Sequence, residues 1–264
     1  MLTNPVKTKI CAGEAVFGTI CALPSPEVVE IIGVAGYDCV LIDLEHGPID
    51  VETVQAMGRA CRAVGIVPLA RVPDANPKII LRMLDSGCLG VMVPQIETPE
   101  AAAGVVAACR YPPAGRRSLA GNTVAARWGA VAAADHVAAS NDAVLAIVQI
   151  ETRGGLESVD AIARTPGLDM LFIGPNDLST SLGHPGEMRH PDVQAAIGRI
   201  LRAAKAAETL SGILALEPAD VETYRSQGAG LFLDGMGRLL LRAAQAQVAG
   251  LRNAASRVTV SRRS

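Results

Sequence analysis

The stretch from Ala143 to Asp177 constrains the fold more than any other part of the chain. It holds two short apolar, β-branched runs that each end in polar residues. Between them, the segment from Glu157 to Arg164 has the apolar spacing of a covering helix. Such runs are typical of strands buried on both faces. Because a strand–helix–strand unit makes its strands parallel, both runs end at the same edge of one sheet.

The same alternation recurs along the whole chain. Further strands are expected at 15–21, 38–43, 66–71, 89–93, 211–216 and 231–233. Helices are expected at 26–36, 50–64, 76–86, 99–110, 191–207, 220–227 and 238–255. Eight strands alternating with helices over about 250 residues predict an α/β fold, a (β/α)8 TIM barrel in a single domain spanning 1–264. The alternative, a doubly wound open sheet, lacks the G-x-G-x-x-G motif after its first strand.

One connection is too long for an ordinary barrel. The segment from Tyr111 to Asn141 carries a Pro-Pro-Ala-Gly-Arg-Arg run, an Arg-Trp pair and an alanine-rich stretch. Connections of this length are usually functional or disordered. We therefore interpret it as a functional loop with an extra helix.

Composition excludes several classes of protein. Half of the 264 residues are apolar and 19% are charged, which favours a sizeable core over disorder. A net charge of -2 gives no electrostatic reason to expect nucleic acid or an anionic membrane. We expect no membrane span and no signal peptide, because the chain has no long uncharged apolar run and its first residues lack an apolar region. Six cysteines without a C-x-x-C pair indicate a reducing compartment, so a cytoplasmic location is expected.

Polar side chains follow the expected strands, where barrel enzymes build their active sites. In chain order they are His46, Arg71, Gln95, Gln149, Glu151, Asp177, Glu217 and Asp234. Two of them, Glu151 and Asp177, end the paired runs described above. Converging carboxylates repel each other unless a cation lies between them, so we expect a hard divalent metal there, Mg²⁺ or Mn²⁺.

The other rim residues indicate proton transfer and anion binding. Asp43 lies three residues before His46 and is expected to fix its tautomer, which makes His46 a candidate general base. Arg71 is expected to bind a carboxylate or oxyanion of the substrate; the alternative is an ion pair with Glu45 or another rim acid. None of the four lysines falls at a strand end, which argues against a Schiff base. A metal, an arginine and a histidine base suit an enolate formed beside a carboxylate.

Several motifs together resemble one enzyme family. They are Leu-Ile-Asp-Leu-Glu-His-Gly-Pro from 41, Pro-Leu-Ala-Arg-Val-Pro from 68, Val-Pro-Gln from 93, Arg-Tyr-Pro-Pro-Ala-Gly-Arg-Arg from 110, Val-Gln-Ile-Glu-Thr from 148 and Phe-Ile-Gly-Pro-Asn-Asp-Leu-Ser from 172. From about Val16 to Ala244 the chain is similar to the HpcH/HpaI family of metal-dependent pyruvate aldolases. The resemblance implies a barrel of the phosphoenolpyruvate/pyruvate type that cleaves 4-hydroxy-2-oxo acids to pyruvate and an aldehyde.

The resemblance also implies roles for individual residues. Glu151 and Asp177 would hold the metal, which could be Mg²⁺, Mn²⁺ or Co²⁺. His46, supported by Asp43, would act as base through a metal-bound water. The substrate-binding residues implied are Arg71, Gln149, Gly174, Pro175, Asn176 and Leu214, with the Gly174–Asp177 turn offering backbone N–H groups to the pyruvate carboxylate. The implied assembly is a hexamer, a trimer of dimers that exchange the helix at 238–255.

The sequence departs from the family at two places and leaves the aldehyde open. Ser118 stands where the family often has Gly. After the eighth strand the family usually has Val-Gly-x-Asp, where this chain has Gly235-Met236-Gly237 with one residue fewer. Succinic semialdehyde, sugar-acid aldehydes and small aldehydes all remain possible, with determinants expected in loops such as Tyr111 to Asn141. Two alternatives stay open: an acyl-CoA lyase of the citryl- or malyl-CoA type, and a non-catalytic barrel that binds oxo acids.

Overall fold

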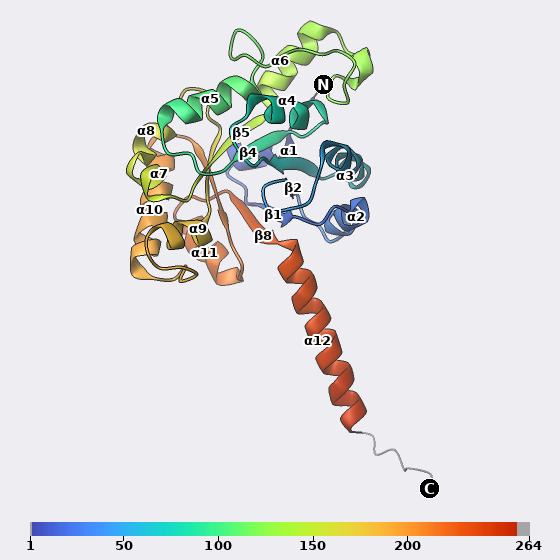
Figure 1. Cartoon of the computed structure of the whole chain (residues 1–264), viewed down its shortest axis with the longest axis vertical. Coiled ribbons are helices and arrows are strands. Elements are labelled where there is room, and N and C mark those ends of the chain that lie inside the picture. The colour runs from blue at the N-terminus through green and yellow to red at the C-terminus, as the bar shows by residue number, and fades with distance from the viewer. Residues whose placement is uncertain (1, 258–264) are drawn as a thin grey trace.

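The computed structural model describes residues 2–257, and these form a closed barrel of parallel strands (Figure 1). Each strand pairs with the next, and β8 pairs with β1 to close the ring. The strands are β1 (Val16–Cys21), β2 (Cys39–Asp43), β3 (Val67–Arg71), β4 (Gly90–Val93), β5 (Leu145–Ile150), β6 (Met170–Ile173), β7 (Leu210–Leu214) and β8 (Leu231–Gly235). The (β/α)8 barrel expected from the sequence is confirmed.

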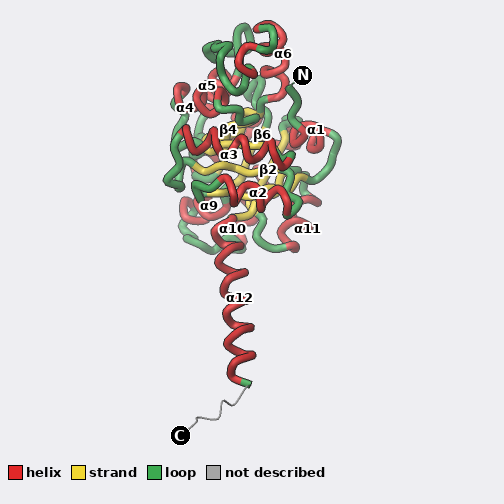
Figure 2. Tube along the Cα trace, turned by 90° about the vertical axis from the view of Figure 1, so that its right-hand side faces the viewer, coloured by secondary structure: helices red, strands yellow, loops and turns green. Residues whose placement is uncertain are grey.

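Helices surround the strands, and proline often occupies the first helical turn, where its missing N–H costs nothing. They are α1 (Pro5–Cys11), α2 (Pro26–Val34), α3 (Val51–Val64), α4 (Pro77–Asp85), α5 (Pro99–Cys109), α6 (Ala133–Ala143), α7 (Arg153–Glu157), α8 (Val159–Ala163), α9 (Pro175–Ser181), α10 (Pro191–Ala206), α11 (Pro218–Ser226) and α12 (Met236–Ser256). In Figure 2 the helices form an outer layer around the strands. Side chains of Ser25, Asp50 and Thr98 cap α2, α3 and α5, as their residue types favour.

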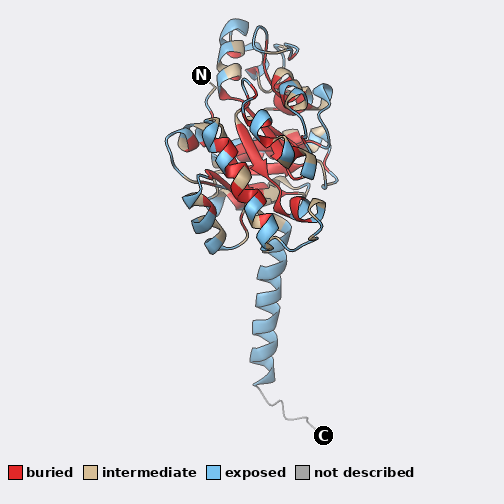
Figure 3. Cartoon of the chain, turned by 90° about the vertical axis from the view of Figure 1, so that its left-hand side faces the viewer, coloured by how far each residue is buried: buried red, intermediate tan, exposed pale blue. Residues whose placement is uncertain are grey.

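The strand side chains alternate between two separate cores. One core fills the barrel and includes Leu41 and Leu69, whereas the other lies between the strands and the helices and includes Val40 and Ala70. Figure 3 shows the buried strands at the centre of the molecule. Because inward residues recur every second position, the interior face of each strand leads directly to the side chains at its C-terminal end.

The structure corrects three local expectations. The chain begins with α1, which the sequence reading missed; Asn4 caps it and also donates to the carbonyls of Leu89 and Ala143 at the barrel's N-terminal end. The single helix expected from Glu157 is two short helices, α7 and α8, that meet at Ser158. The expected turn at Gly174 is instead the start of helix α9.

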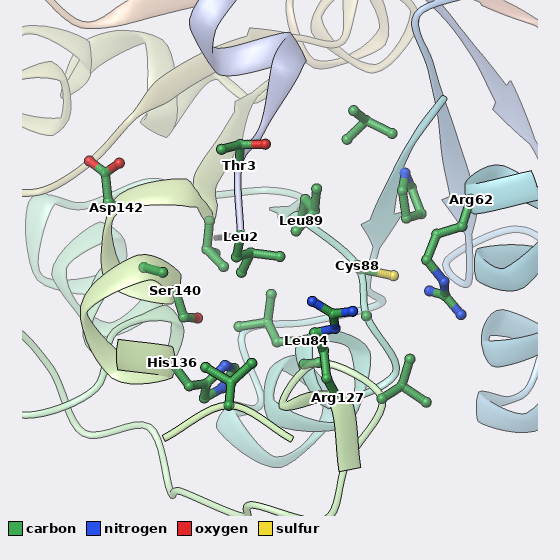
Figure 4. A pocket seen from close by; sticks show the side chains of 18 of the residues that line it. Leu2, Thr3, Arg62, Leu84, Cys88, Leu89, Arg127, His136, Ser140 and Asp142 are labelled. Carbon is green, nitrogen blue, oxygen red and sulfur yellow. The ribbon is translucent and has the colours of Figure 1, made fainter. Parts of the chain in front are cut away.

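The long connection between α5 and β5 lies at the wrong end of the barrel for the role expected of it. It lines a cavity of about 1370 Å³ together with residues at the N-terminal ends of β3 and β4, such as Val67 and Leu89. Figure 4 shows Arg127 and His136 of this connection beside the cavity. The expected extra helix is present as α6. However, the connection flanks the N-terminal ends of the strands, so within one chain it cannot hold the determinants expected at the catalytic rim.

The last helix packs on its own barrel only at its start, where Met236 contacts the core between strands and helices and two arginines pair with Glu217. Helix α12 extends away from the molecule, and none of its residues is buried (Figures 1 and 3). Among residues 2–257, no helix combines the length and apolar character needed to cross a bilayer.

Candidate active site

The inward face of three strands continues into a polar cluster at the C-terminal rim. Leu41 leads to Asp43 on β2, and Leu69 leads to Arg71 on β3. On β5, Ile147 leads to Gln149 and then to Glu151 just after the strand. Asp43, Arg71, Gln149 and Glu151 are all at least 93% buried, since their exposed fractions are 2%, 7%, 2% and 2%. A buried polar cluster above an apolar barrel core is the usual location of a barrel active site.

Arg71 is held by two carboxylates. Asp43 and Arg71 face each other in register on adjacent strands. The Arg71 Nε donates to Asp43 Oδ1 at 2.9 Å and its Nη2 to Asp43 Oδ2 at 2.7 Å. Its Nη1 lies 3.2 Å from Glu45 Oε2. The ion pair with rim acids, which was the alternative for Arg71, is therefore present, and binding of a substrate anion stays a prediction.

Glu151 is a buried carboxylate whose hydrogen bonds offset only part of the cost of burying its charge. It accepts from the backbone N–H of Gln95 at 3.0 Å and from the Gln149 side chain. Burial raises the pKa of the Glu151 carboxyl to about 7, and the charges of Asp177 and, more weakly, Glu45 add to the rise. The Gln95 N–H and the Arg71 charge oppose it. A group in this state is stabilised by any cation that approaches it.

Gly174 lets the backbone approach this carboxylate. A Cβ at Gly174 would lie 2.3 Å from Glu151 Oε2 and 2.5 Å from Gln149 Nε2. No side chain fits there without displacing both groups. Helix α9 begins directly afterwards, and Asn176 and Asp177 in its first turn are exposed. Glu151 and Asp177 are thus brought together at the rim, one buried and one open to solvent.

The geometry around His46 differs from the expected His46–Asp43 pair. Asp43 directs its carboxylate to Arg71 and accepts only backbone N–H groups from Glu45 and His46, at 3.1 and 3.4 Å. The His46 ring lies in the exposed loop after β2, with its Nε2 3.9 Å from Glu45 Oε2. Glu45, to which the sequence reading gave no catalytic role, is therefore the acid beside the ring. Burial raises the pKa of Glu45, against the opposing charges of Arg71 and His46.

Two other expected rim acids serve elsewhere. Asp234 accepts a hydrogen bond from the Tyr37 hydroxyl at 2.6 Å and lies on the outward face of β8, next to the inward Leu233. Glu217 caps α11 and pairs with Arg238 and Arg242 of α12.

Leu214 ends β7 on the inward face, two positions after the inward Gly212. It is partly buried, as a residue at the edge of a substrate cavity would be.

The donor set fits a hard divalent cation. Glu151 and Asp177 supply carboxylate oxygens, and burial together with the nearby charge of Asp177 raises the pKa of Glu151. Gln149 adds a buried amide oxygen that has no hydrogen-bond partner among the described residues. The two carboxylates are the side chains that would hold the ion. Burial of one carboxylate beside a second negative charge is costly, and a bound cation would offset this cost.

A barrel whose C-terminal rim carries buried carboxylates and a fixed arginine has the parts of an enzyme active site. The chain belongs to the HpcH/HpaI aldolase/citrate lyase family, whose model matches residues 18–241. Enzymes of this family generally depend on a divalent metal. The chain is an aldolase-type lyase of that family.

Similar proteins span nearly the whole chain. A 5-keto-4-deoxy-D-glucarate aldolase from Salmonella paratyphi C is 42% identical over 226 residues, covering 86% of this chain and 88% of the relative. A hydroxypyruvate/pyruvate aldolase from Chromohalobacter salexigens is 40% identical over 242 residues, covering 91% and 94%. The crystal structure of an HpcH/HpaI aldolase/citrate lyase family protein from Burkholderia cenocepacia matches with a TM-score of 0.89 at 39% identity, covering 95% of this chain and 100% of that chain.

Proposed function

We propose that the protein cleaves a 4-hydroxy-2-oxo acid to pyruvate and an aldehyde, and catalyses the reverse addition. The proposal rests on one observation: a fixed guanidinium and a buried carboxylate with a raised pKa lie together at the C-terminal rim of the barrel. Arg71 is immobilised by Asp43 and Glu45, while Glu151 lies within the field of Asp177. Anion binding and cation binding side by side are what an enolate flanked by a carboxylate requires.

Arg71 is assigned the oxygen atoms of the pyruvyl group. Two of its nitrogens are occupied by Asp43, so the guanidinium cannot rotate when charge develops on the substrate. Preorganised donors of this kind stabilise a transition state without a cost of reorientation. Gln149, whose Oε1 is buried and unpaired among the described residues, is assigned to the floor of the pyruvate site. Leu214 is assigned to the pyruvate methyl.

His46 is assigned the proton of the 4-hydroxyl group. Its ring is exposed and free to reach a bound substrate, and Glu45 rather than Asp43 is the acid placed to orient it. A divalent ion held by Glu151 and Asp177 would polarise the 2-keto oxygen and so lower the energy of the enolate. We expect Mg²⁺, Mn²⁺ or Co²⁺. The prediction that backbone N–H groups of Gly174 to Asp177 bind the pyruvate carboxylate stands beside these assignments.

The aldehyde half remains to be assigned by experiment. The names of the two relatives describe a sugar-acid substrate in one case and hydroxypyruvate in the other. A polar, hydroxylated aldehyde is the class we therefore favour, in sugar-acid catabolism. The CoA-lyase alternative would need a basic groove at the rim. The arginines of the long connection, Arg116, Arg117 and Arg127, do not supply one at the rim of their own subunit, because that connection lies at the opposite end of the barrel.

The first test is deuterium exchange into the methyl group of pyruvate in D₂O, followed by proton NMR. The experiment asks about enolate formation without requiring the right aldehyde. Exchange that depends on added Mg²⁺, Mn²⁺ or Co²⁺ and stops with EDTA supports the proposal, and a panel of hydroxylated aldehydes follows. A folded, metal-loaded protein that gives no exchange points instead to the CoA-lyase or binding alternatives.

We further propose that α12 packs on a second copy of this chain. Its Leu241, Val248 and Leu251 are exposed at helical spacing along one side. On the outer face of β1, Phe17 is 43% exposed and stacks on the buried Phe232 of β8 at 5.8 Å. The uncovered apolar side of α12 and the exposed Phe17 ring favour exchange of the helix between subunits, consistent with the expected hexamer.

A further inference from the structure

A second group of metal-binding side chains lies outside the rim site. His184, His190 and Asp192 form what we name the histidine cluster, in which one ligand atom from each residue lies within 4.8 Å of the others. The three residues come from the loop after α9 and the first turn of α10. We propose that the histidine cluster binds one transition-metal ion, Zn²⁺ by ligand type, independently of the carboxylate site at Glu151 and Asp177.

The separations between ligand atoms are close to those that a tetrahedral ion needs. Ligand atoms about 2.0–2.1 Å from Zn²⁺ lie about 3.3 Å from one another in a tetrahedron. Asp192 Oδ2 lies 3.2 Å from His184 Nε2 and 3.7 Å from His190 Nδ1. Only small shifts of the carboxylate are needed along these two edges.

The imidazole rings must rearrange to complete the site. They are stacked, with centroids 3.5 Å apart and planes inclined by 16°. Because imidazole lone pairs lie in the ring plane, stacked rings do not point at one ion, and one ring must rotate. His190 Nδ1 also accepts a hydrogen bond of 3.3 Å from the Asp192 N–H, the cap of α10. Coordination through Nδ1 replaces this long hydrogen bond with a metal–nitrogen bond.

The surrounding loop fixes the backbone of both histidines and leaves an approach from solvent. The His184 N–H donates to the Ser179 carbonyl at 2.8 Å, and the His190 N–H donates to the Glu187 carbonyl at 2.9 Å. A hollow of about 520 Å³ lined by residues 186–190 adjoins His190 and gives room for a water ligand. The nearby Arg189 is turned away, since it pairs with Asp220 at 2.8 Å. A bound ion would tie the end of α9, whose first turn carries Asp177, to the start of α10.

The test counts zinc bound to metal-free protein in excess Mg²⁺, which occupies hard carboxylate sites and does not compete for imidazole. Wild-type protein is expected to retain one equivalent of Zn²⁺ after gel filtration. In the same protein, Co²⁺ should give the visible absorption bands of a tetrahedral nitrogen–oxygen site. The Glu151→Gln variant should retain the equivalent, because it lacks only the rim ligand.

Three variants remove the site and one serves as its control. His184→Gln, Asp192→Asn and His190→Asn should each lose the zinc and the cobalt bands, and Asn at 190 keeps a good helix cap. Glu187→Gln removes an exposed charge from the same loop and should bind zinc as the wild type does. The proposal fails if wild-type protein retains no zinc, if the three variants bind as much as the wild type, or if Glu151→Gln alone abolishes binding.

Discussion

Arg71 and Asp43 face each other in register on neighbouring strands and share two hydrogen bonds of 2.9 and 2.7 Å. Lysine retains the charge of arginine but cannot form this two-pronged contact. We expect Arg71→Lys to slow metal-dependent deuterium exchange into pyruvate by about 100-fold, the usual loss when one preorganised donor is removed. Arg153→Lys, at an exposed position on α7, is the matched control. Equal rates for the two variants would remove Arg71 from the site.

His46 is the base proposed for the 4-hydroxyl proton. General base catalysis typically contributes about 10²–10⁴-fold, so His46→Ala should lose most turnover in retro-aldol cleavage. Metal and pyruvate binding should be unaffected, because the His46 ring is exposed and lies outside the buried cluster. Calorimetric titration with pyruvate and a coupled lactate dehydrogenase assay separate the two effects. Turnover at the wild-type level would refute the assignment.

The acid beside the His46 ring, Glu45, could not be predicted from the sequence. The sequence paired His46 with Asp43, only three residues away, but alternation along β2 turns Asp43 into the barrel toward Arg71. The register of β2 and β3 decides this partnership, and one sequence does not reveal register. The inward series ending at Arg71, Gln149 and Glu151 was predictable, because it needs only strand ends and a period of two.

The long connection was expected at the wrong end of the barrel, and the order of the elements explains why. In a barrel, a segment between a helix and the next strand lies at the N-terminal ends of the strands, and the Tyr111–Asn141 connection follows α5 and precedes β5. Its unusual length predicted a functional role. Its place in the order of elements, after a helix and before a strand, already excluded a location at the catalytic rim of its own subunit. The surface on which α12 packs was harder to predict from the sequence, because a helix that packs on its own barrel and one that packs on a partner can have the same apolar pattern.

Glu151 should make the stability of the metal-free protein depend on pH. Its pKa is raised to about 7 in the folded state, against 4.5 for the free side chain. Between these values the folded protein keeps a proton that the unfolded chain releases, so rising pH favours unfolding. The loss is complete above about pH 7 and amounts to about 3 kcal/mol. Urea unfolding from pH 4.5 to 8 with EDTA measures it.

The variants sharpen that measurement. Glu151→Gln should remove much of the pH dependence, with a smaller remainder from Glu45, whose pKa is also raised. Saturating Mn²⁺ should flatten the wild-type profile, because a cation stabilises the ionised carboxylate. Glu151→Ala should in addition abolish stoichiometric binding of Mn²⁺ at the rim. Retention of one tightly bound Mn²⁺ by that variant would show that Glu151 is not a ligand.

Gly174 tests the close approach of backbone and carboxylate. In Gly174→Ala the new methyl group would meet Glu151 Oε2 at 2.3 Å and Gln149 Nε2 at 2.5 Å. Both groups must move, so Mn²⁺ affinity and pyruvate exchange should each fall by at least about tenfold, equivalent to about 1.4 kcal/mol. Gly104→Ala in helix α5 has open space around its Cβ and should leave both unchanged while stabilising the helix slightly. Equal metal affinity in the two variants would mean that the rim tolerates a side chain at 174.

The uncovered side of α12 predicts how the chain assembles. Leu241 and Leu251 are 58% and 60% exposed. Apolar side chains exposed along one side of a helix are typical of a surface that packs against a partner. If the apolar side of α12 packs against a partner's barrel near the exposed Phe17, a charge on that side must be desolvated on assembly. Leu251→Asp should therefore convert the assembly to smaller species in light scattering at micromolar concentration. The control is Arg252→Asp, which changes charge at the neighbouring exposed position on another side of the helix. An unchanged mass for Leu251→Asp, or dissociation by both variants alike, would contradict packing through this side of α12.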